Sequence, residues 1–377
     1  MAIRVSVLGH GFIAKAHAHA YLTAPEFYEV KKPKLELVYG RDEKSLSDFA
    51  RRFGFNAYST DLPRSISEGD VVDNCLPNHL HAAPTLEALE KGKHVFLEKP
   101  MALSVKDAEE MALAANKAGV KAAIGFNYRF LPAISLAKKL IEEGRIGKVH
   151  EFRGAYLQEY LSNPNTPVAQ SGVLIGWRQR KELAGSGSLG DLGSHLIDMA
   201  RYLVGEIREV VAQEQILYPE RPTETGEKIK VEVDDAFSSL VKFDGGATGV
   251  IEASRVAPGM KNQQRVEVHG NKGSIAFNLE RPNELSVYLE DEPSTAGFRT
   301  IIADDPHWWP PGHVLGWEHS VVMEIAQFLK AVESDEPLYP MASFQDGLSA
   351  QKVLDAIERS ARSGKWETVG RCRDDCE

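Results

Sequence analysis

The stretch RVSVLGHGFIA, residues 4–14, decides how the first part of this chain folds. Its first five residues predict a buried strand, and its last residues begin a helix predicted to run to about Leu22. Gly9 permits a tight turn between the two, Gly11 lets a ligand approach the backbone, and Ala14 allows close packing of helix on strand. Phosphate groups bind well at such a helix N-terminus. A glycine motif alone is weak evidence, but a preceding strand and a following helix together predict a dinucleotide-binding turn.

Beyond this stretch, predicted strands and helices alternate to about residue 125, which is typical of a doubly wound parallel α/β sheet. The pattern then changes to successive hairpins over residues 209–302, which predict a mainly antiparallel sheet. Two helices are predicted after it, the first over residues 317–333. We therefore predict a Rossmann domain at residues 1–125, an α+β domain at 126–370 and a disordered tail at 371–377.

The composition limits the class of protein. The chain has 377 residues, of which 43% are hydrophobic and 26% charged, as in soluble globular proteins large enough for two cores. A net charge of -10 and a pI near 5.7, without a basic stripe, argue against a nucleic-acid partner. The sequence shows no apolar run long enough to span a bilayer, so we expect a cytoplasmic protein with no membrane partner. Cys75, Cys372 and Cys376 predict neither a disulfide framework nor a metal site.

A second stretch, HVFLEKP at residues 94–100, places charged groups directly after a predicted buried strand. In open parallel sheets, ligands bind outside the carboxyl ends of the strands. Lys99 therefore lies where a functional side chain is expected, and Pro100 stops the strand from continuing. The alternative is a surface pair of Glu98 and Lys99 at a strand end, and this stretch alone does not decide between the two.

The end of the second predicted strand bears on the choice of cofactor. A site for NAD usually has an acid there for the ribose hydroxyl, whereas a site for NADP has an arginine near the 2′-phosphate. Here the expected acidic position is Gly40, followed by Arg41. This favours NADP slightly over NAD, although Arg41 could be solvated and Asp42 could reach the ribose or cap the next helix.

A third motif lies in the predicted second domain. Asp191, His195 and Asp198 are spaced four and then three residues apart, which places them on one face of a predicted helix. A carboxylate one turn from an imidazole can orient it and tune its pKa for acid–base chemistry. The alternative is that Asp191 caps the helix and His195 is a core residue.

Together these motifs resemble those of the glucose–fructose oxidoreductase/inositol dehydrogenase (Gfo/Idh/MocA) family over nearly the whole chain. The resemblance rests on Gly9-x-Gly11-x-x-Ala14, Cys75-x-Pro77-Asn78-x-x-His81, Glu98-Lys99-Pro100 and Gly190-Asp191-x-Gly193-x-His195-x-x-Asp198. Residues 153–158, Trp177-Arg178 and Val233-Asp234-Asp235 favour a sugar-dehydrogenase branch of that family. The resemblance implies an NAD(P)-dependent oxidoreductase that moves a hydride between the nicotinamide and a hydroxyl or ketone carbon of a sugar or cyclic polyol.

The resemblance also implies roles for single residues. Lys99 would contact the reacting hydroxyl, His195 would be the general acid–base, and Asp191 would bind substrate and support the pair. Because all three are present, we expect an active enzyme. A dinucleotide- and sugar-sensing protein without turnover is one alternative, and a reductase of a non-sugar ring, of the dihydrodiol type, is another.

Two larger sets complete the predicted site. Cofactor contacts are expected from Gly9, Gly11, Phe12, Ile13, Gly40, Arg41, Pro77, Asn78, His81, Glu98 and Lys99. Substrate contacts are expected from Lys99, Asn127, Arg129, Tyr156, Trp177, Asp191, His195 and Trp308, the last in a Pro-rich loop whose tryptophans could wall a sugar pocket or pack in the core. The resemblance further implies a homodimer or homotetramer that packs through the open face of the C-terminal sheet.

Overall fold

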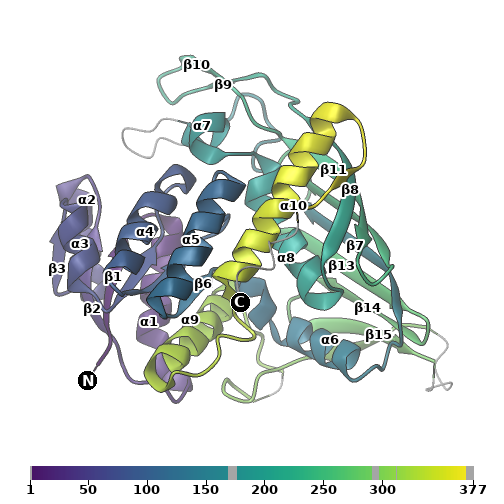
Figure 1. Ribbon diagram of the computed structural model, residues 1–377, viewed down its shortest axis with the longest axis horizontal. Helices are drawn as coiled ribbons and strands as arrows, with labels where there is room; N and C mark the ends of the chain where they lie inside the picture. The colour runs from purple at the N-terminus through teal and green to yellow at the C-terminus, as the bar shows by residue number, and fades with distance from the viewer. Residues whose placement is uncertain (1, 169–175, 291–296, 311, 371–377) are drawn as a thin grey trace. The chain divides into compact units, whose positions relative to one another are not determined.

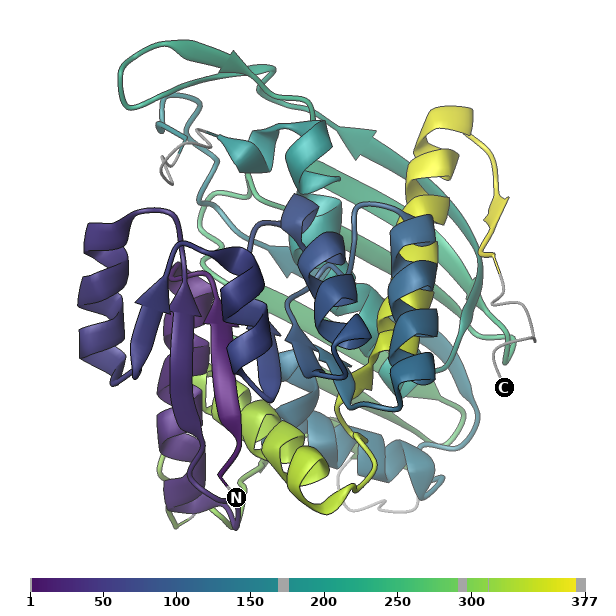
Figure 2. The same ribbon diagram turned by 60° about the vertical axis from the view of Figure 1, so that its left-hand side comes forward.

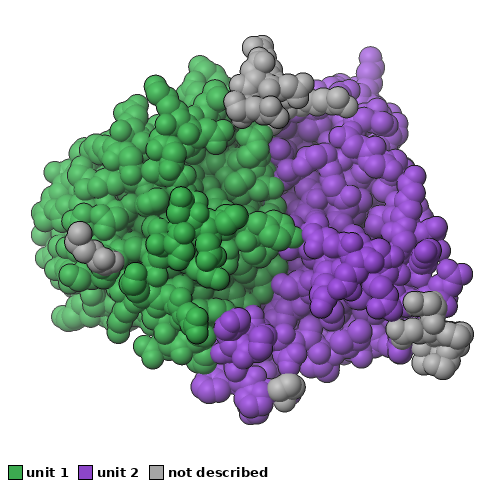
Figure 3. Space-filling view, turned by 60° about the horizontal axis from the view of Figure 1, so that its bottom comes forward, with its two compact units in different colours: residues 1–130, 316–348, 376–377 green, residues 131–315, 349–375 purple. Residues whose placement is uncertain are grey.

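The computed structural model describes residues 2–168, 176–290, 297–310 and 312–370. The predicted tail at 371–377 lies outside these described residues. The described chain divides into two compact units, drawn in two colours in Figure 3. Of the described residues, unit 1 takes those up to Phe130 together with Gly316–Leu348, and unit 2 takes those within Leu131–Leu315 together with 349–370.

Unit 1 is built on a sheet whose order, among the described residues, is β17-β6-β5-β4-β1-β2-β3. All neighbouring strands run parallel except β17, which pairs antiparallel with β6 at one edge. The strands are β1 (Arg4–Leu8), β2 (Lys34–Tyr39), β3 (Ala57–Ser59), β4 (Val71–Asn74), β5 (His94–Leu97), β6 (Ala122–Ile124) and β17 (Ala342–Ser343). The α-helices between them are α1 (Phe12–Phe27), α2 (Glu43–Phe53), α3 (Leu62–Glu68), α4 (Ala82–Glu90) and α5 (Val105–Ala118) (Figure 1).

The central strands of unit 1 are buried because helices cover them. In β4 every residue is buried, and in β1 and β5 only the first residue is not. Helices α3, α4 and α5 pack side by side along the sheet (Figure 2). The strand order reverses between β1 and β4, and at such a point the strand ends leave a crevice for a ligand.

Helix α9 (Trp317–Ser334) returns to unit 1 from the far end of the chain and packs against α1. Its Phe328 ring stacks on Phe96 of β5 with centroids 5.4 Å apart. The helix has the predicted extent, but the sequence placed it in the second domain. Burial of its apolar face on the parallel sheet is the physical reason that residues 316–348 group with unit 1.

Unit 2 contains a sheet with the described order β16-β15-β14-β13-β7-β12-β11-β8-β18, in which only β7 and β12 run parallel. The strands are β7 (Val149–Leu157), β8 (Ile207–Gln215), β11 (Ala236–Phe243), β12 (Thr248–Ser254), β13 (Gln263–Gly270), β14 (Gly273–Asn278), β15 (Glu284–Leu289), β16 (Arg299–Ile302) and β18 (Glu367–Thr368). A separate ribbon pairs β9 (Glu220–Pro222) with β10 (Lys228–Lys230).

Burial alternates along the strands of this sheet, as expected when one face is packed. Helices α6 (Pro132–Glu142) and α8 (Ser194–Leu203) pack on the buried face, α6 against β14 and β15 and α8 against β7. The short helix α7 (Lys181–Ala184) precedes α8, and α10 (Phe344–Ser363) begins in unit 1 and continues into unit 2.

These observations confirm the predicted fold class, a parallel Rossmann sheet followed by a mainly antiparallel sheet in an α+β domain. Among the described residues, no helix is both long and apolar enough to cross a membrane.

Candidate active site

The glycine-rich turn after β1 has the geometry that the sequence predicts. Gly9 has a φ of 109°, and a Cβ there would come within 3.0 Å of the Cys75 carbonyl oxygen. Its N–H donates to the Tyr39 carbonyl at 2.9 Å, which ties the turn to the neighbouring strand end. At Gly11, the residue before α1, an added Cβ would meet no atom within 4 Å, so the space beside the helix N-terminus is open. Backbone N–H groups at such a terminus suit a pyrophosphate, and the turn therefore fits a dinucleotide.

The first residues of α1 differ in exposure. Phe12 is 76% exposed and its ring stacks on Trp317 with centroids 5.5 Å apart, whereas Ile13 is half-buried. Phe12 therefore offers an apolar surface next to the glycine turn. The predicted contact of both residues with the cofactor stays a prediction.

The end of β2 explains why glycine stands at position 40. A Cβ at Gly40 would overlap the ring of His10, so an acidic side chain does not fit there without moving that ring. The next acid, Asp42, caps α2 by accepting from the Ser45 N–H at 3.0 Å, and these bonds to Ser45 lower the pKa of Asp42. Arg41 lies exposed between them.

The turn after β4 carries three predicted cofactor ligands. Pro77 and Asn78 are half-buried at the start of a short 3₁₀ turn (Asn78–Leu80). His81 is buried, and its two ring nitrogens lie 2.8 Å from the carbonyl oxygens of Leu76 and Pro100. Its ring thus links the chain after β4 to the chain after β5. The structure gives His81 this bracing position, and its direct contact with the cofactor stays a prediction.

Lys99 follows β5 at the carboxyl edge of the parallel sheet, as the sequence predicts. The preceding Glu98 is buried, and its carboxylate accepts from the Lys99 backbone N–H at 3.2 Å. The other carboxylate oxygen of Glu98 lies 3.1 Å from Nε2 of His17 in α1. Glu98 therefore points into the unit and holds the backbone of Lys99, whose side chain is half-buried.

Asn127 and Arg129, two predicted substrate ligands, lie in a buried 3₁₀ turn after β6. The Asn127 side-chain amide donates to Ser320 Oγ at 2.7 Å. The Arg129 guanidinium donates to the Pro340 carbonyl at 3.3 Å and to the Asp346 carboxylate at 3.4 Å. These contacts attach the turn to α9 and to the start of α10 within unit 1, and any contact with substrate stays a prediction.

In unit 2, Asp191 lies in a π-helical turn (Leu189–Gly193) that leads directly into α8, where His195 is the second residue. The Tyr160 hydroxyl donates to the Asp191 carboxylate at 3.0 Å. Although Tyr160 as a whole is 43% exposed, desolvation of its hydroxyl and the negative charge of Asp191 raise the pKa of Tyr160. His195 is 7% exposed, and the centroid of its ring lies 6.1 Å from that of Tyr156 in β7.

The π-helical turn is held by a residue that sequence reasoning did not select. The buried Asp234 carboxylate accepts from Gly187 N at 2.6 Å, Ser188 Oγ at 2.5 Å and Leu189 N at 2.9 Å. A Cβ at Gly187 would overlap the Asp234 carbonyl oxygen, so only glycine allows this approach. The π-helical turn that carries Asp191 is therefore held in place at Leu189, the residue with which it begins.

Arg255 is a second residue that the sequence analysis missed. Its side chain is 1% exposed and its Nη2 donates to the Asp234 carbonyl at 2.8 Å. Burial lowers the pKa of Arg255, but the nearby Tyr160, Asp234 and Asp191 outweigh it and raise the pKa. A buried cation therefore faces the carboxylates around the turn. The sequence signal for Asp234 was the Val233-Asp234-Asp235 segment, and it indicated the contact partner neither of Asp234 nor of Arg255.

Trp177 and Trp308 complete the predicted substrate set. Trp177 is half-buried in a short 3₁₀ turn, with the guanidinium of Arg178 4.5 Å from the centroid of its ring. Trp308 is half-buried in the Pro-rich loop, where its backbone N–H donates to the Asp305 carbonyl. The structure thus brings the predicted cofactor ligands and Lys99 into unit 1, and Asp191, His195 and Tyr156 into unit 2. The pairing of Lys99 with His195 stays a prediction.

This combination of a dinucleotide-binding sheet and a second α+β unit defines a class of nicotinamide-dependent oxidoreductases. Residues 3–126 match the family model described as "Oxidoreductase family, NAD-binding Rossmann fold", and residues 134–276 match the "GFO/IDH/MocA C-terminal domain". The chain belongs to the Gfo/Idh/MocA family.

Individual relatives agree with this assignment. Levoglucosan dehydrogenase of Pseudarthrobacter phenanthrenivorans is 38% identical over 97% of this chain and 98% of its own. Myo-inositol 2-dehydrogenase of Thermotoga maritima is 30% identical over 97% of this chain and 99% of its own. A solved structure of levoglucosan dehydrogenase in complex with NADH and levoglucosan has a TM-score of 0.92 and 39% identity, covering 98% of this chain and 100% of that chain. The predicted class, an NAD(P)-dependent oxidoreductase acting on CH–OH groups of sugars or polyols, is confirmed.

Proposed function

We propose that this protein oxidises a ring hydroxyl of a pyranose-type sugar with NAD, and reduces the corresponding ketone in reverse. The observation that carries the proposal is the placement of Lys99 at the carboxyl edge of the parallel sheet, with its backbone held by the buried Glu98. The relatives named above support a sugar or polyol substrate, and levoglucosan is the first candidate because the relative that is 38% identical is named for it.

The proposed chemistry divides the work between cofactor and protein. NAD, when bound, accepts the hydride from the substrate carbon. His195 takes the hydroxyl proton onto a ring nitrogen during oxidation and returns it during reduction. Lys99 donates a hydrogen bond to the same oxygen and stabilises the negative charge that develops there. Asp191, held by Tyr160, binds a neighbouring substrate hydroxyl and fixes the substrate relative to His195.

For the cofactor, we propose NAD rather than NADP. The relative's solved complex contains NADH, and nothing in the comparisons supports the slight preference for NADP that Gly40 and Arg41 suggested. At the end of β2 the crowding by His10 already accounts for Gly40 without a 2′-phosphate. Fluorescence titration with NADH and NADPH tests this choice. A tenfold or greater preference for NADPH would restore the original prediction and assign the 2′-phosphate to Arg41.

We also propose that the protein forms a homo-oligomer through the less buried face of the unit 2 sheet. The support is the exposure of large apolar residues on its strands, such as Leu240 at 50% and Ile302 at 56%. Such residues are the kind that a subunit interface covers. The mass measured by light scattering distinguishes a dimer or tetramer from a monomer, and a monomeric mass contradicts the proposal.

The function is tested by steady-state reduction of NAD with a panel of levoglucosan, alkyl glucosides, free pyranoses and inositols. Lys99→Ala should lower turnover on the best substrate by roughly 10²–10⁴-fold, the contribution of a positioned proton-transfer group, with little change in NADH affinity. Lys106→Ala, which changes an exposed lysine in α5, is the matched control. Normal turnover in Lys99→Ala refutes its role, and NADH binding without turnover on any member of the panel favours the sensing alternative.

A further inference from the structure

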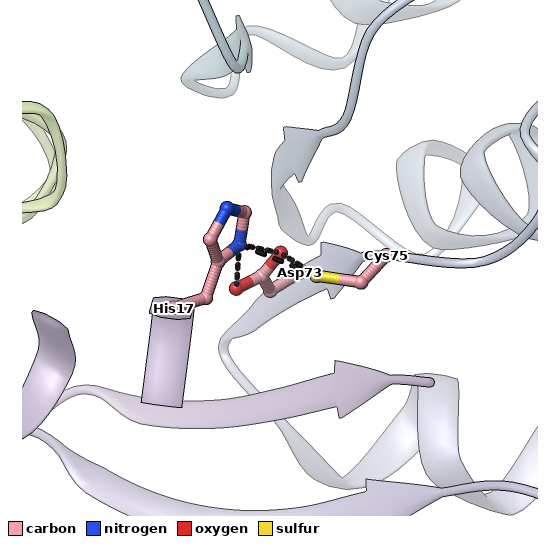
Figure 4. A group of neighbouring side chains, drawn as sticks. All are labelled: His17, Asp73 and Cys75. Carbon is pink, nitrogen blue, oxygen red and sulfur yellow. Dashed lines mark hydrogen bonds and ion pairs between the residues drawn. The ribbon is translucent and has the colours of Figure 1, made fainter. Parts of the chain in front are cut away.

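Behind the turn that carries Lys99, unit 1 contains a buried cluster of titratable side chains to which the proposed mechanism assigns no role. Figure 4 shows His17 of α1 pointing toward Asp73 of β4 and toward Cys75, which follows that strand. The relative exposures of these three residues are 1%, 0% and 9%. His17 Nδ1 lies 3.0 Å from both carboxylate oxygens of Asp73 and 3.3 Å from the Cys75 sulfur.

The opposite nitrogen of the same ring extends the cluster to Glu98. His17 Nε2 lies 3.1 Å from Glu98 Oε1, so each ring nitrogen faces a carboxylate. A neutral imidazole has one donor and one acceptor nitrogen, whereas the imidazolium has two donors. Only the charged ring can donate to both acids, and its single positive charge offsets part of the cost of burying two carboxylates.

The groups packed around His17 favour the charged ring. Burial lowers the pKa of His17, but the negative charge of Asp73 and its hydrogen bond to the ring outweigh burial and raise the pKa well above its ordinary value. Burial has the opposite effect on the Cys75 thiol: it raises the pKa of Cys75, so the thiol stays protonated and adds no charge beside the ring. On α1, burial and the negative charge of Asp73 raise the pKa of Tyr21. The negative charge of Glu324 in α9 raises it further. On β5, the ring of Phe96 lies 5.0 Å from the His17 ring, between centroids, and adds no charge.

Glu98 connects this cluster to the catalytic turn. One carboxylate oxygen lies against His17, and the other accepts from the Lys99 backbone N–H at 3.2 Å. The first oxygen is also close to Gly125, where an added Cβ would lie 2.7 Å from it. The carboxylate is therefore confined on several sides, and its position fixes the backbone from which Lys99 projects.

We propose that His17 is a positioning residue for Lys99: as an imidazolium it joins Asp73 to Glu98, and through Glu98 it holds the Lys99 backbone in the geometry needed for proton transfer. The effect on turnover rests on the proposed role of Lys99, whereas the charge state of His17 does not depend on that role. Supporting residues of this kind change rates about 10- to 100-fold in comparable sites, because a displacement of about 1 Å misaligns the reacting groups.

The ligand atoms of His17, Asp73 and Cys75 lie within 4.8 Å of one another, which is close enough for one metal ion to bind all three. With or without a metal, Nε2 of His17 carries a proton that it donates to Glu98. The two cases differ at Nδ1, where a metal ion would replace the proton between the ring and Asp73. Metal analysis of the purified protein separates the two. Stoichiometric zinc that survives dialysis overturns the imidazolium assignment, and its absence agrees with it.

The charge state is tested directly on the wild type by ¹⁵N NMR of histidine-labelled protein, with His17 assigned by its loss in a variant. We expect both ring nitrogens to be protonated at pH 7, and still protonated at pH 8, where an ordinary histidine is neutral. A neutral ring at pH 7, with one protonated and one bare nitrogen, overturns the proposal whatever the activity of the enzyme. In Asp73→Asn the ring should lose its second proton at a lower pH than in the wild type.

Two variants with different reach test the connection to Lys99. The amide of His17→Asn reaches the position of Nδ1 and can donate only to Asp73, whereas that of His17→Gln reaches the position of Nε2 and can donate to Glu98. We expect His17→Asn to lower kcat about 10- to 100-fold with KM and NADH affinity within about twofold, and His17→Gln to recover most of that loss. Equal losses in both variants, or a loss confined to stability, would mean that His17 only fills the core. Cys75→Ser, which keeps the charge pattern, is the control and should keep kcat within about twofold.

Discussion

Replacing Asp234 by Asn should both destabilise unit 2 and slow the enzyme. In the wild type the buried carboxylate accepts three hydrogen bonds, from Gly187 N, Ser188 Oγ and Leu189 N, and bonds to a charged acceptor contribute about 1.5–3 kcal/mol each. The asparagine oxygen can keep the two bonds from Ser188 and Leu189 at the strength of neutral bonds, which loses about 1 kcal/mol for each. Its NH₂ group then faces the Gly187 N–H, and that buried donor is left unsatisfied at a further cost of about 1–3 kcal/mol.

The expected loss is therefore about 3–5 kcal/mol in the free energy of unfolding, measured by urea denaturation followed by tryptophan fluorescence. Turnover should fall about 10- to 100-fold, because the π-helical turn that carries Asp191 loses its anchor. Asp235→Asn is the matched control, since Asp235 is also buried but accepts from Leu217 N and Tyr218 N instead. It should lose stability and keep turnover within about twofold. A stability loss under about 1 kcal/mol in Asp234→Asn, or equal kinetics in the two variants, would refute the reasoning.

Three further changes have definite expected results. Gly187→Ala places a methyl group on the Asp234 carbonyl oxygen and should lower the free energy of unfolding by at least about 3 kcal/mol, with Gly245→Ala in an open turn as the control. Burial, together with Asp234 and Glu358, raises the pKa of Glu214 to about 7, above its ordinary value of 4.5, so wild-type stability should fall as the pH rises through that interval. Glu214→Gln should therefore be more stable than the wild type at pH 8 and equal to it below pH 4.5, as measured by thermal melts. His195→Asn should remove the rise of oxidation rate with pH that a histidine base produces near its ordinary pKa of about 6.5; an unchanged pH limb in single-turnover measurements would show that another group accepts the proton.

The parts of the fold that depend on local pattern could be predicted from the sequence. The glycine turn at Gly9 and the strand before Glu98 follow from backbone sterics and from continuous apolar runs, and both occur as expected. The extent of α9 also follows from its periodicity. Its partner does not, because an apolar helix face does not specify which sheet it will cover. In the structure α9 packs on α1 and places Phe328 on Phe96 of β5.

The motifs of the candidate site can be recognised in the sequence, whereas the residues that hold those motifs in place cannot. Asp191 and His195 carry a spacing that can be recognised, whereas Asp234 lies 46 residues from Ser188 and its contact exists only after the sheet forms. Similarly, Asn127 and Arg129 are polar residues after a strand end, where a ligand contact is expected. In the structure they form hydrogen bonds with Ser320, Pro340 and Asp346. These contacts could not be predicted, because a polar residue at a strand end looks the same in the sequence whether it contacts a ligand or another part of its own domain.

The return of residues 316–348 to unit 1 has a consequence for how the chain is made and how it can be recombined. During synthesis the parallel sheet emerges first, but the surface around Phe96 is covered only when α9 leaves the ribosome, after all of residues 131–315. The nascent first 130 residues therefore expose an apolar surface throughout the synthesis of unit 2, which is the situation in which chaperones act. For the same reason a chimaera that exchanges only the first 130 residues with a relative would pair a foreign sheet with the native α9. A functional exchange of cofactor specificity by recombination needs both segments to come from the same parent.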